Sequence, residues 1–220
     1  MEILTKDNKT EHLSLKKALT THEQTFDINA GNSPMAFVML LRSYAGILKK
    51  NGIDAYSVPM TDEFLKSAGM VAEWVHNRPT CGLLICGEVG NGKTTMVEAL
   101  TNLYAVRCNK LMTNVTALHI ADLYRTGDTD GINAIKNSLM LSIDDLGTEA
   151  VWVKSWGNEI SPVTDVIYHR YAKRMMTVVT TNMAAFQIRD RYGDRIADRF
   201  REMMTVVPFL DKSYRGGGER

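Results

Sequence analysis

The sequence predicts an α/β fold, with three layers arranged around a five-stranded parallel sheet. From residue 82 onward, short continuous apolar runs alternate with helical stretches, a pattern typical of parallel strands that are buried on both faces. The first run leads directly into a glycine-rich segment and then a helix, the junction at which sheets of this class bind phosphates. The five predicted strands are Gly82–Cys86, Met112–Thr116, Leu139–Ile143, Met176–Thr181 and Met204–Phe209.

Helices are predicted both ahead of the sheet and between its strands. Met35–Lys50 is rich in good helix formers and ends close to a glycine, which supplies the left-handed conformation that stops a helix. Thr61 precedes a second run with apolar residues at helical spacing, so it is expected to be an N-cap. Among the strands, periodicity predicts a helix over Thr95–Val106, and Ser161–Pro162 has the residue types that begin another.

The charge balance bears on the kind of partner. The chain of 220 residues has 26 Lys and Arg against 25 Asp and Glu, a formal net charge of +1. This argues against a protein that holds nucleic acid through uniform positive charge. Between Arg170 and Arg201, however, eight Lys or Arg residues stand against three Asp. Any contact with DNA is therefore expected to be local and sensitive to salt.

Composition also excludes several classes of protein. The longest apolar run, Met35–Leu41, is far shorter than the roughly 20 residues of a membrane-spanning helix, and the N-terminus lacks the pattern of a signal peptide. We therefore expect a cytoplasmic protein without membrane contact. Cys81, Cys86 and Cys108 are odd in number and show no C-x-x-C spacing, so neither a disulfide framework nor a zinc site is expected.

The glycine-rich segment carries the strongest functional signal. Residues 87–95 read GEVGNGKTT and match G-x-x-x-x-G-K-[ST], a loop whose backbone N–H groups surround phosphate oxygens. Lys93 is expected to reach the terminal phosphates of a nucleotide, and the Thr94 hydroxyl to bind Mg²⁺. The predicted nucleotide-binding residues are Gly87, Glu88, Val89, Gly90, Asn91, Gly92, Lys93, Thr94 and Thr95.

Polar residues at the ends of two later strands complete the predicted site. Asp144 and Asp145 follow an apolar run, and we expect Asp144 to hold the metal and Asp145 to orient and polarise the attacking water. Glu149 is a weaker third candidate for these roles. Asn182 ends the fourth strand, at the sheet edge where ligands of open α/β sheets bind, so it is expected to contact the terminal phosphate or the lytic water.

Two other classes of nucleotide-binding protein also use a phosphate loop. GTP-binding switch proteins read guanine with N-K-x-D, and the N-K at Asn109–Lys110 has no acid at the required place. Small-molecule phosphotransferases also combine a phosphate loop with an arginine-rich lid, so the arginines between residues 189 and 199 keep that class open as a remote alternative.

The order of five motifs resembles a known family. GEVGNGKTT, LSIDDLGTE, VVTTNM, YGDRIADRFRE and KSYR occur in the order found in the AAA+ ATPases of the bacterial replicative-helicase-loader (DnaC-like) group, with the transposition helpers (IstB-like) close by. The resemblance implies a three-layer P-loop NTPase of the AAA+ type without a C-terminal lid domain. It also implies ATP with Mg²⁺, slow and assembly-dependent hydrolysis, homo-oligomers that form with ATP, and single-stranded DNA as a partner.

The same resemblance assigns roles to arginines. The segment beginning at Tyr192 carries, in that family, an arginine finger that reaches the nucleotide of a neighbouring subunit, so Arg195 and Arg199 are the candidates here. A helix whose arginines pair internally with Asp194 and Asp198 is the alternative. Arg215 is similar in position to the family's second sensor, a contact to the terminal phosphate.

Function and domain organisation follow from the resemblance as expectations. Residues 1–54 are expected to form an arm and helix that bind a partner, and residues 55–220 the ATPase core. The expected function is an ATP-hydrolysing replication accessory that loads or regulates a replicative helicase on single-stranded DNA. A transposition helper acting with a transposase is the alternative. Asp145 stands where AAA+ proteins commonly have Glu, which puts the rate of hydrolysis, rather than binding, in question.

Residues that could touch DNA are less sharply marked. Tyr124, Arg125 and Lys136 lie between the second and third predicted strands, where the family presents DNA-contacting helices, although a solvated surface explains them as well. Trp152 and Trp156 follow the acidic motif, and either base stacking or packing in a core or interface is compatible with them.

Overall fold

The computed structural model describes residues 13–14, 33–55, 58–155 and 157–210. The helices in this part of the chain are α2 (Ser33–Lys50), α3 (Asp62–Asn77), α4 (Lys93–Cys108), α5 (Ala117–Thr126), α6 (Thr129–Asn137), α7 (Pro162–Ala172), α8 (Ala185–Tyr192) and α9 (Asp194–Met203). The strands are β1 (Leu13–Ser14), β2 (Pro59–Met60), β3 (Gly82–Gly87), β4 (Thr113–Thr116), β5 (Met140–Leu146), β6 (Val153–Ser155), β7 (Asn158–Ile160), β8 (Met176–Thr181) and β9 (Met204–Phe209).

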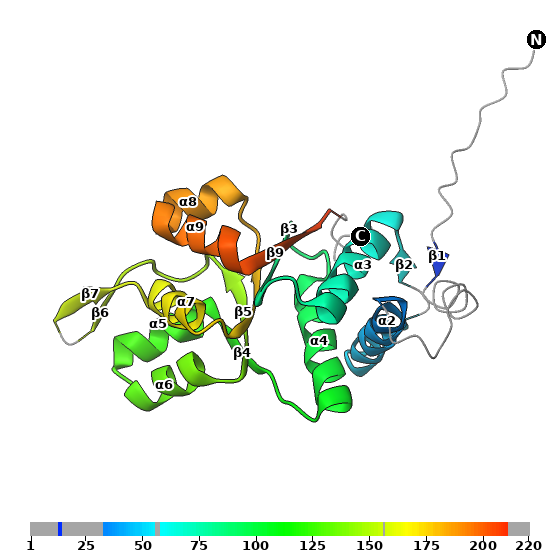
Figure 1. Cartoon of the computed structure of the whole chain (residues 1–220), viewed down its shortest axis with the longest axis horizontal. Coiled ribbons are helices and arrows are strands. Elements are labelled where there is room, and N and C mark those ends of the chain that lie inside the picture. The colour runs from blue at the N-terminus through cyan, green and yellow to red at the C-terminus, as the bar shows by residue number, and fades with distance from the viewer. Residues whose placement is uncertain (1–12, 15–32, 56–57, 156, 211–220) are drawn as a thin grey trace, which may run out of the picture.

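A five-stranded parallel sheet forms the centre of the molecule (Figure 1). Its strand order is β4-β5-β8-β3-β9, and each of the five predicted apolar runs forms one of these strands. The predicted α/β fold with a five-stranded parallel sheet is therefore confirmed. Because all five strands run the same way, the phosphate loop after β3 and the end of β8 lie at the same edge of the sheet as the acidic end of β5.

Helices cover both faces of the sheet and give the three layers (Figure 1). Leu83 and Ile85 of β3 join one hydrophobic cluster with α2, α3 and α4. Leu84, which points to the opposite face, joins a second cluster with α5, α7 and α9. Both faces of the strand are buried in apolar surroundings, which is the physical reason that the strand appears in the sequence as a continuous apolar run.

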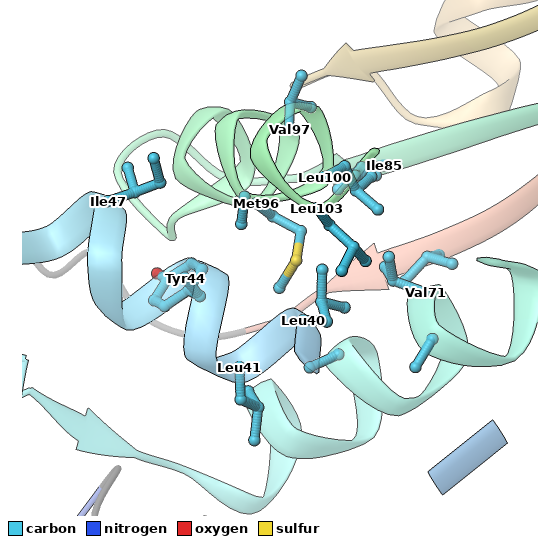
Figure 2. Packing of buried hydrophobic residues seen from close by; sticks show 14 of the residues in the cluster. Leu40, Leu41, Tyr44, Ile47, Val71, Ile85, Met96, Val97, Leu100 and Leu103 are labelled. Atoms are coloured by element: carbon cyan, nitrogen blue, oxygen red, sulfur yellow. The ribbon is translucent and has the colours of Figure 1, made fainter. Parts of the chain in front are cut away.

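The helix α2 packs into this core. Leu40, Leu41 and Tyr44 are buried in the same cluster as residues of α3 and α4, and Figure 2 shows Leu40 and Tyr44 beside Met96 of α4. The hydroxyl of Ser43 also donates to the carbonyl oxygen of Ala99 at 2.7 Å. The boundary between residues 54 and 55 stays a prediction, but α2 itself shares its hydrophobic core with the helices beyond that boundary.

Local signals account for some of the element ends. The side chain of Thr61 accepts a hydrogen bond from the backbone N–H of Phe64 at 3.0 Å, so the predicted N-cap is confirmed. Pro162 is the first residue of α7, but the hydroxyl of Ser161 donates to that of Thr164 rather than capping the backbone. Two short antiparallel pairs, β1–β2 and β6–β7, were not predicted, and β6–β7 projects away from the sheet (Figure 1).

No helix in the described part of the chain combines the length and the hydrophobicity that crossing a bilayer requires.

Candidate functional site

The phosphate loop follows β3 and has a backbone shape that depends on glycine. Gly90 and Gly92 have φ angles of 85° and 90°, in the left-handed region that side chains with a Cβ rarely adopt. A Cβ on Gly87 would lie 2.1 Å from the carbonyl oxygen of Phe209, so this position has no room for a side chain. The loop is also tied to β9, because the side-chain amide of buried Asn91 donates to the same Phe209 carbonyl at 2.7 Å.

Lys93 begins α4 and folds its side chain back over the loop. Its ammonium donates to the carbonyl oxygens of Gly87 at 2.9 Å and Glu88 at 2.6 Å, and to the side-chain oxygen of Asn91 at 3.2 Å. The side chain is buried, with 6% of its surface exposed, yet it lines the adjacent cavity. The ammonium is therefore placed inside the loop, at the position from which it can exchange carbonyl oxygens for phosphate oxygens.

Thr94, in the first turn of α4, meets Asp144 near the end of β5. The Thr94 hydroxyl donates to the two carboxylate oxygens of Asp144 at 3.1 and 3.3 Å. Hydroxyl and carboxylate oxygens are hard donors of the type that Mg²⁺ prefers, so the pair fits this ion. The sequence placed these two residues in one metal site on motif grounds, and the fold brings them into direct contact.

Thr180 supports this pair and was not predicted. It is fully buried on β8, its hydroxyl donates to Asp144, and the same oxygen accepts the backbone N–H of Asp145 at 2.9 Å. One hydroxyl thus fixes the side chain of the first acid and the backbone of the second. The sequence signal was weak, because Thr180 appears there only as one of two threonines that end an apolar strand.

Asp145 lies in a bulge at the end of β5. The register with β8 shifts between Ile143 and Leu146, and Asp145 has a φ of 55°, which is uncommon outside glycine but tolerated by Asp. The carbonyl oxygen of Asp145 accepts hydrogen bonds from both the backbone N–H and the hydroxyl of Thr148. The bulge turns Asp145 into the cavity that Lys93 also lines.

This cavity has a volume of about 500 Å³ and gathers most of the predicted nucleotide site. Asp145 and Asn182 line it together with loop residues 89, 90 and 92–95. Its other wall comes from the end of α2 and the segment after it, through Tyr44, Leu48, Asn51, Ile53 and Val58. Sequence reasoning missed this second wall, because it assigned the helix to a partner-binding arm.

The helix α9 presents its two candidate arginines differently. Ile196, Phe200 and Met203 are buried, as the predicted apolar face requires. Arg199 lies over the ring of Tyr171, with 4.5 Å between its guanidinium carbon and the ring centroid, and it donates to Glu202. Arg195 is exposed and forms no ion pair within the described residues.

The aspartates of α9 do not hold these arginines. Asp194 pairs with Arg189 at 3.2 Å, and Asp198 pairs with Arg201 at 3.3 Å. The alternative in which Asp194 and Asp198 pair with the two candidate arginines is therefore wrong for the ion pairs that the structure contains.

The predicted DNA-contacting residues are only partly exposed. Tyr124 is buried, and its hydroxyl donates to Asp165 at 2.6 Å; burial, with this hydrogen bond, raises the pKa of its hydroxyl. Lys136 pairs with the same carboxylate at 2.5 Å. The expectation of a surface role is thus wrong for Tyr124. Arg125 and Trp152 are exposed, and Trp152, with 63% of its surface accessible, is not a core residue.

Two assignments lie outside the described residues, namely Arg215 and Trp156. Among the residues that the structure does describe, no group of three or more His, Cys, Asp or Glu side chains could hold a metal ion. The Thr94–Asp144 pair is a candidate of another kind, since it would offer one carboxylate and one hydroxyl and leave the remaining ligands to water and phosphate.

Solved structures of other proteins are similar to this fold. No protein-family model matches the chain, and no curated protein sequence matches it. Among solved structures, the DnaC helicase loader matches with 22% identity and a TM-score of 0.58, covering 69% of this chain and 92% of that one. DnaI matches with 23% identity and a TM-score of 0.53, covering 67% and 85%.

Two further structures extend this set. A putative primosome component from Streptococcus pyogenes serotype M3 has 18% identity and a TM-score of 0.58, covering 70% of this chain and 82% of that one. DnaA from Aquifex aeolicus, with AMPPCP bound, has 18% identity and a TM-score of 0.53, covering 70% and 48%. The chain therefore shares the three-layer α/β fold of these structures.

Proposed function

We propose that the protein binds ATP in the cavity beside Lys93 and hydrolyses it slowly, in an assembly of several copies. The observation that carries this proposal is the junction of Thr94, Asp144 and Thr180 next to a glycine-shaped loop with Lys93 inside it. Mg²⁺ bound at this junction would neutralise charge that develops on the phosphates. The solved structure of DnaA with AMPPCP, an ATP analogue, supports a nucleotide in a site of this fold.

The chain's own residues divide the chemistry among themselves. Lys93 would exchange its carbonyl partners for oxygens of the terminal phosphates. Asp145, held by its backbone hydrogen bond to Thr180, would accept a hydrogen bond from the attacking water and orient it. Asn182, which follows β8 and lines the same cavity, would donate its amide to the terminal phosphate or the water.

We assign the arginine finger to Arg195. Arg199 already contacts Tyr171 and Glu202, whereas Arg195 is exposed near the start of α9. Arg195 is not among the residues that line the cavity of its own copy. The phosphate that it would contact therefore has to be bound by another copy. The proposal therefore includes assembly with ATP, so that Arg195 of one copy reaches the nucleotide of the next.

The biological role that we propose is a DNA-replication accessory that loads or regulates a replicative helicase on single-stranded DNA. The support is the fold shared with the DnaC helicase loader and DnaI, together with the ordered motifs of the chain. Arg125 and Trp152 are exposed residues through which a DNA strand would be held, by phosphate contact and by base stacking.

A subunit-mixing experiment tests the shared site. Lys93→Ala subunits would lack their own site but keep Arg195, and Arg195→Ala subunits would keep their site but lack the finger. We expect each variant alone to lose at least about 100-fold in ATP hydrolysis, the loss seen when one charge-stabilising group is removed, and the mixture to regain activity. Arg201→Ala, on the same helix and paired with Asp198, is the matched control and should hydrolyse ATP normally.

Two results would contradict the proposal. If Arg195→Ala alone hydrolyses ATP at the wild-type rate, the finger assignment fails. If the wild-type protein binds no fluorescent ATP analogue in the presence of Mg²⁺, the nucleotide site itself fails. A capture experiment with purified replicative helicase and single-stranded DNA, run with and without ATP, then tests the accessory role.

A further inference from the structure

A buried carboxylate joins the nucleotide site to the helix that carries Arg195. Glu149, with 2% of its surface exposed, follows the bulge at the end of β5. One of its carboxylate oxygens accepts a hydrogen bond from the backbone N–H of Gly147 at 2.9 Å, and the other accepts a hydrogen bond from the hydroxyl of Tyr192. Its main-chain carbonyl accepts a hydrogen bond from the guanidinium of Arg191. A carboxylate is expensive to bury, so these partners matter.

On one side, Glu149 is connected to the carboxyl edge of the sheet, where the cavity lies. A turn follows β5, and in it the carbonyl oxygen of Asp145 accepts two hydrogen bonds from Thr148. Gly147 has a φ of 107°, and a Cβ there would lie 2.8 Å from the terminal methyl of Met183, the residue after Asn182. The turn held by Glu149 therefore continues from β5 and packs against the segment that follows β8, and both of these strand ends contribute a residue to the cavity.

On the other side, Glu149 is connected to the junction between α8 and α9. Tyr192 is the last residue of α8, and Gly193, with a φ of 87° and nothing within 4 Å of a Cβ placed there, separates it from α9. Arg195 is in the first turn of α9. Burial, and then the hydrogen bond to Glu149, raise the pKa of Tyr192, so its hydroxyl remains a donor at neutral pH.

We propose that Glu149 is a positioning residue, which through Tyr192 fixes the start of α9 relative to Asp145, so that Arg195 is presented to the neighbouring copy. This inference rests on the proposed function, because it needs Arg195 to act in the next site. Glu149 is not among the residues that line the cavity, so it would not touch a nucleotide bound there. Its effect on hydrolysis passes through the placement of α9.

The test removes only the hydrogen bond between Tyr192 and Glu149. Tyr192→Phe deletes the hydroxyl and leaves the bond from Gly147 to Glu149 in place. We expect kcat to fall about 10- to 100-fold, the range that small misplacements of a catalytic group produce, while KM and the affinity for a fluorescent ATP analogue change less than about twofold. The midpoint of thermal unfolding should fall by only about 2–4 °C, as for the loss of one hydrogen bond in a domain of this size.

Two comparisons separate positioning from a purely structural role. Tyr168→Phe removes another half-buried tyrosine hydroxyl, on α7, and should leave kcat unchanged. Adding Glu149→Ala to Tyr192→Phe should lower kcat no further than Glu149→Ala alone, because each change breaks the contact between residues 149 and 192. If the two losses instead multiply, or if Tyr192→Phe has the wild-type kcat, the inference is wrong.

Subunit mixing gives the sharpest outcome. In a mixture of Tyr192→Phe with excess Lys93→Ala subunits, the active sites belong to the first variant and the arginines come mainly from the second, whose α9 is correctly held. Recovery of the turnover per active site supports the inference, and no recovery overturns it. The mixture of Lys93→Ala with Arg195→Ala is run in parallel: if that pair fails to recover, the proposed shared site has failed instead.

Discussion

Lys93 and Arg170 are both buried cations, but they lie at opposite edges of the sheet and are held in different ways. Lys93 donates to three acceptors that belong to its own loop. Arg170, which is fully buried, donates to the hydroxyl of Thr177 at 2.8 Å, and to main-chain carbonyls of two segments that flank the sheet. Those carbonyls belong to Ile135, Lys136, Ser138 and Met176.

The difference separates a structural cation from one that is available for chemistry. Each of the three guanidinium nitrogens of Arg170 donates to a group of the protein itself, so its contacts hold it within the fold. Burial lowers the pKa of Arg170 to about 10, which still leaves it charged at neutral pH. Lys93, by contrast, borders a cavity of about 500 Å³, where phosphate oxygens would take the place of loop carbonyls.

The largest effect is expected at Arg170. Arg170→Met keeps much of the volume but removes the guanidinium that donates to the Thr177 hydroxyl and to the carbonyls of Ser138 and Met176. We expect a loss of about 3–5 kcal/mol in the free energy of unfolding, measured by urea denaturation. Arg174→Met, an exposed arginine four residues on, is the control and should change the free energy by less than about 0.5 kcal/mol.

This prediction bears on the basic segment between residues 170 and 201. If Arg170→Met is as stable as the control, Arg170 is not the structural element that its contacts indicate. The net positive charge of the segment includes at least one cation that is sealed inside the protein. Counting charges along the sequence therefore overstates the charge that a DNA strand would meet.

The reverse pattern is expected at Lys93. Lys93→Met should reduce ATP hydrolysis by at least about 100-fold, because the ammonium is the group placed to meet the terminal phosphates. The free energy of unfolding should change by less than about 1 kcal/mol, since the acceptors released lie in a loop beside an open cavity. Lys110→Met, at an exposed lysine, serves as the matched control for both measurements. A large loss of stability in Lys93→Met would contradict this prediction, because Lys93 would then be a structural cation like Arg170.

Sequence patterns predicted the parts of the molecule that are encoded locally. The five strands appear as continuous apolar runs, and the phosphate loop as a motif whose glycines have positive φ at residues 90 and 92. The pairing of Thr94 with Asp144 was inferred from motif order, because carboxyl ends of parallel strands share one edge. The strands and the loop are each encoded within a few consecutive residues, and the pairing of Thr94 with Asp144 joins two such motifs that lie 50 positions apart.

Contacts between distant segments could not be predicted in this way. Arg170 meets carbonyls more than 30 residues away, and Glu149 meets Tyr192 across 43 positions. Nothing in the sequence around Thr180 marks it as the residue that joins two acids. Tyr124, on the other hand, was predictable: with Ala117, Ile120 and Ala121 it follows the spacing of a buried helix face, and that periodicity outweighs the basic neighbour.

The smallest effect, and the finest test of the contrast, is expected from two threonines of β8. Thr177 and Thr180 are both fully buried, but the first accepts from Arg170 at the amino edge and the second joins Asp144 to Asp145 at the carboxyl edge. Thr180→Val should lower hydrolysis about tenfold and raise the Mg²⁺ concentration for half-maximal activity several-fold, as expected for loss of about 1–1.4 kcal/mol in the support of a metal ligand. Thr177→Val should lower stability by about 1–2 kcal/mol without moving the Mg²⁺ dependence. If both variants shift the Mg²⁺ titration equally, the two edges do not differ in function, and the hydroxyl of Thr180 is only a packing element.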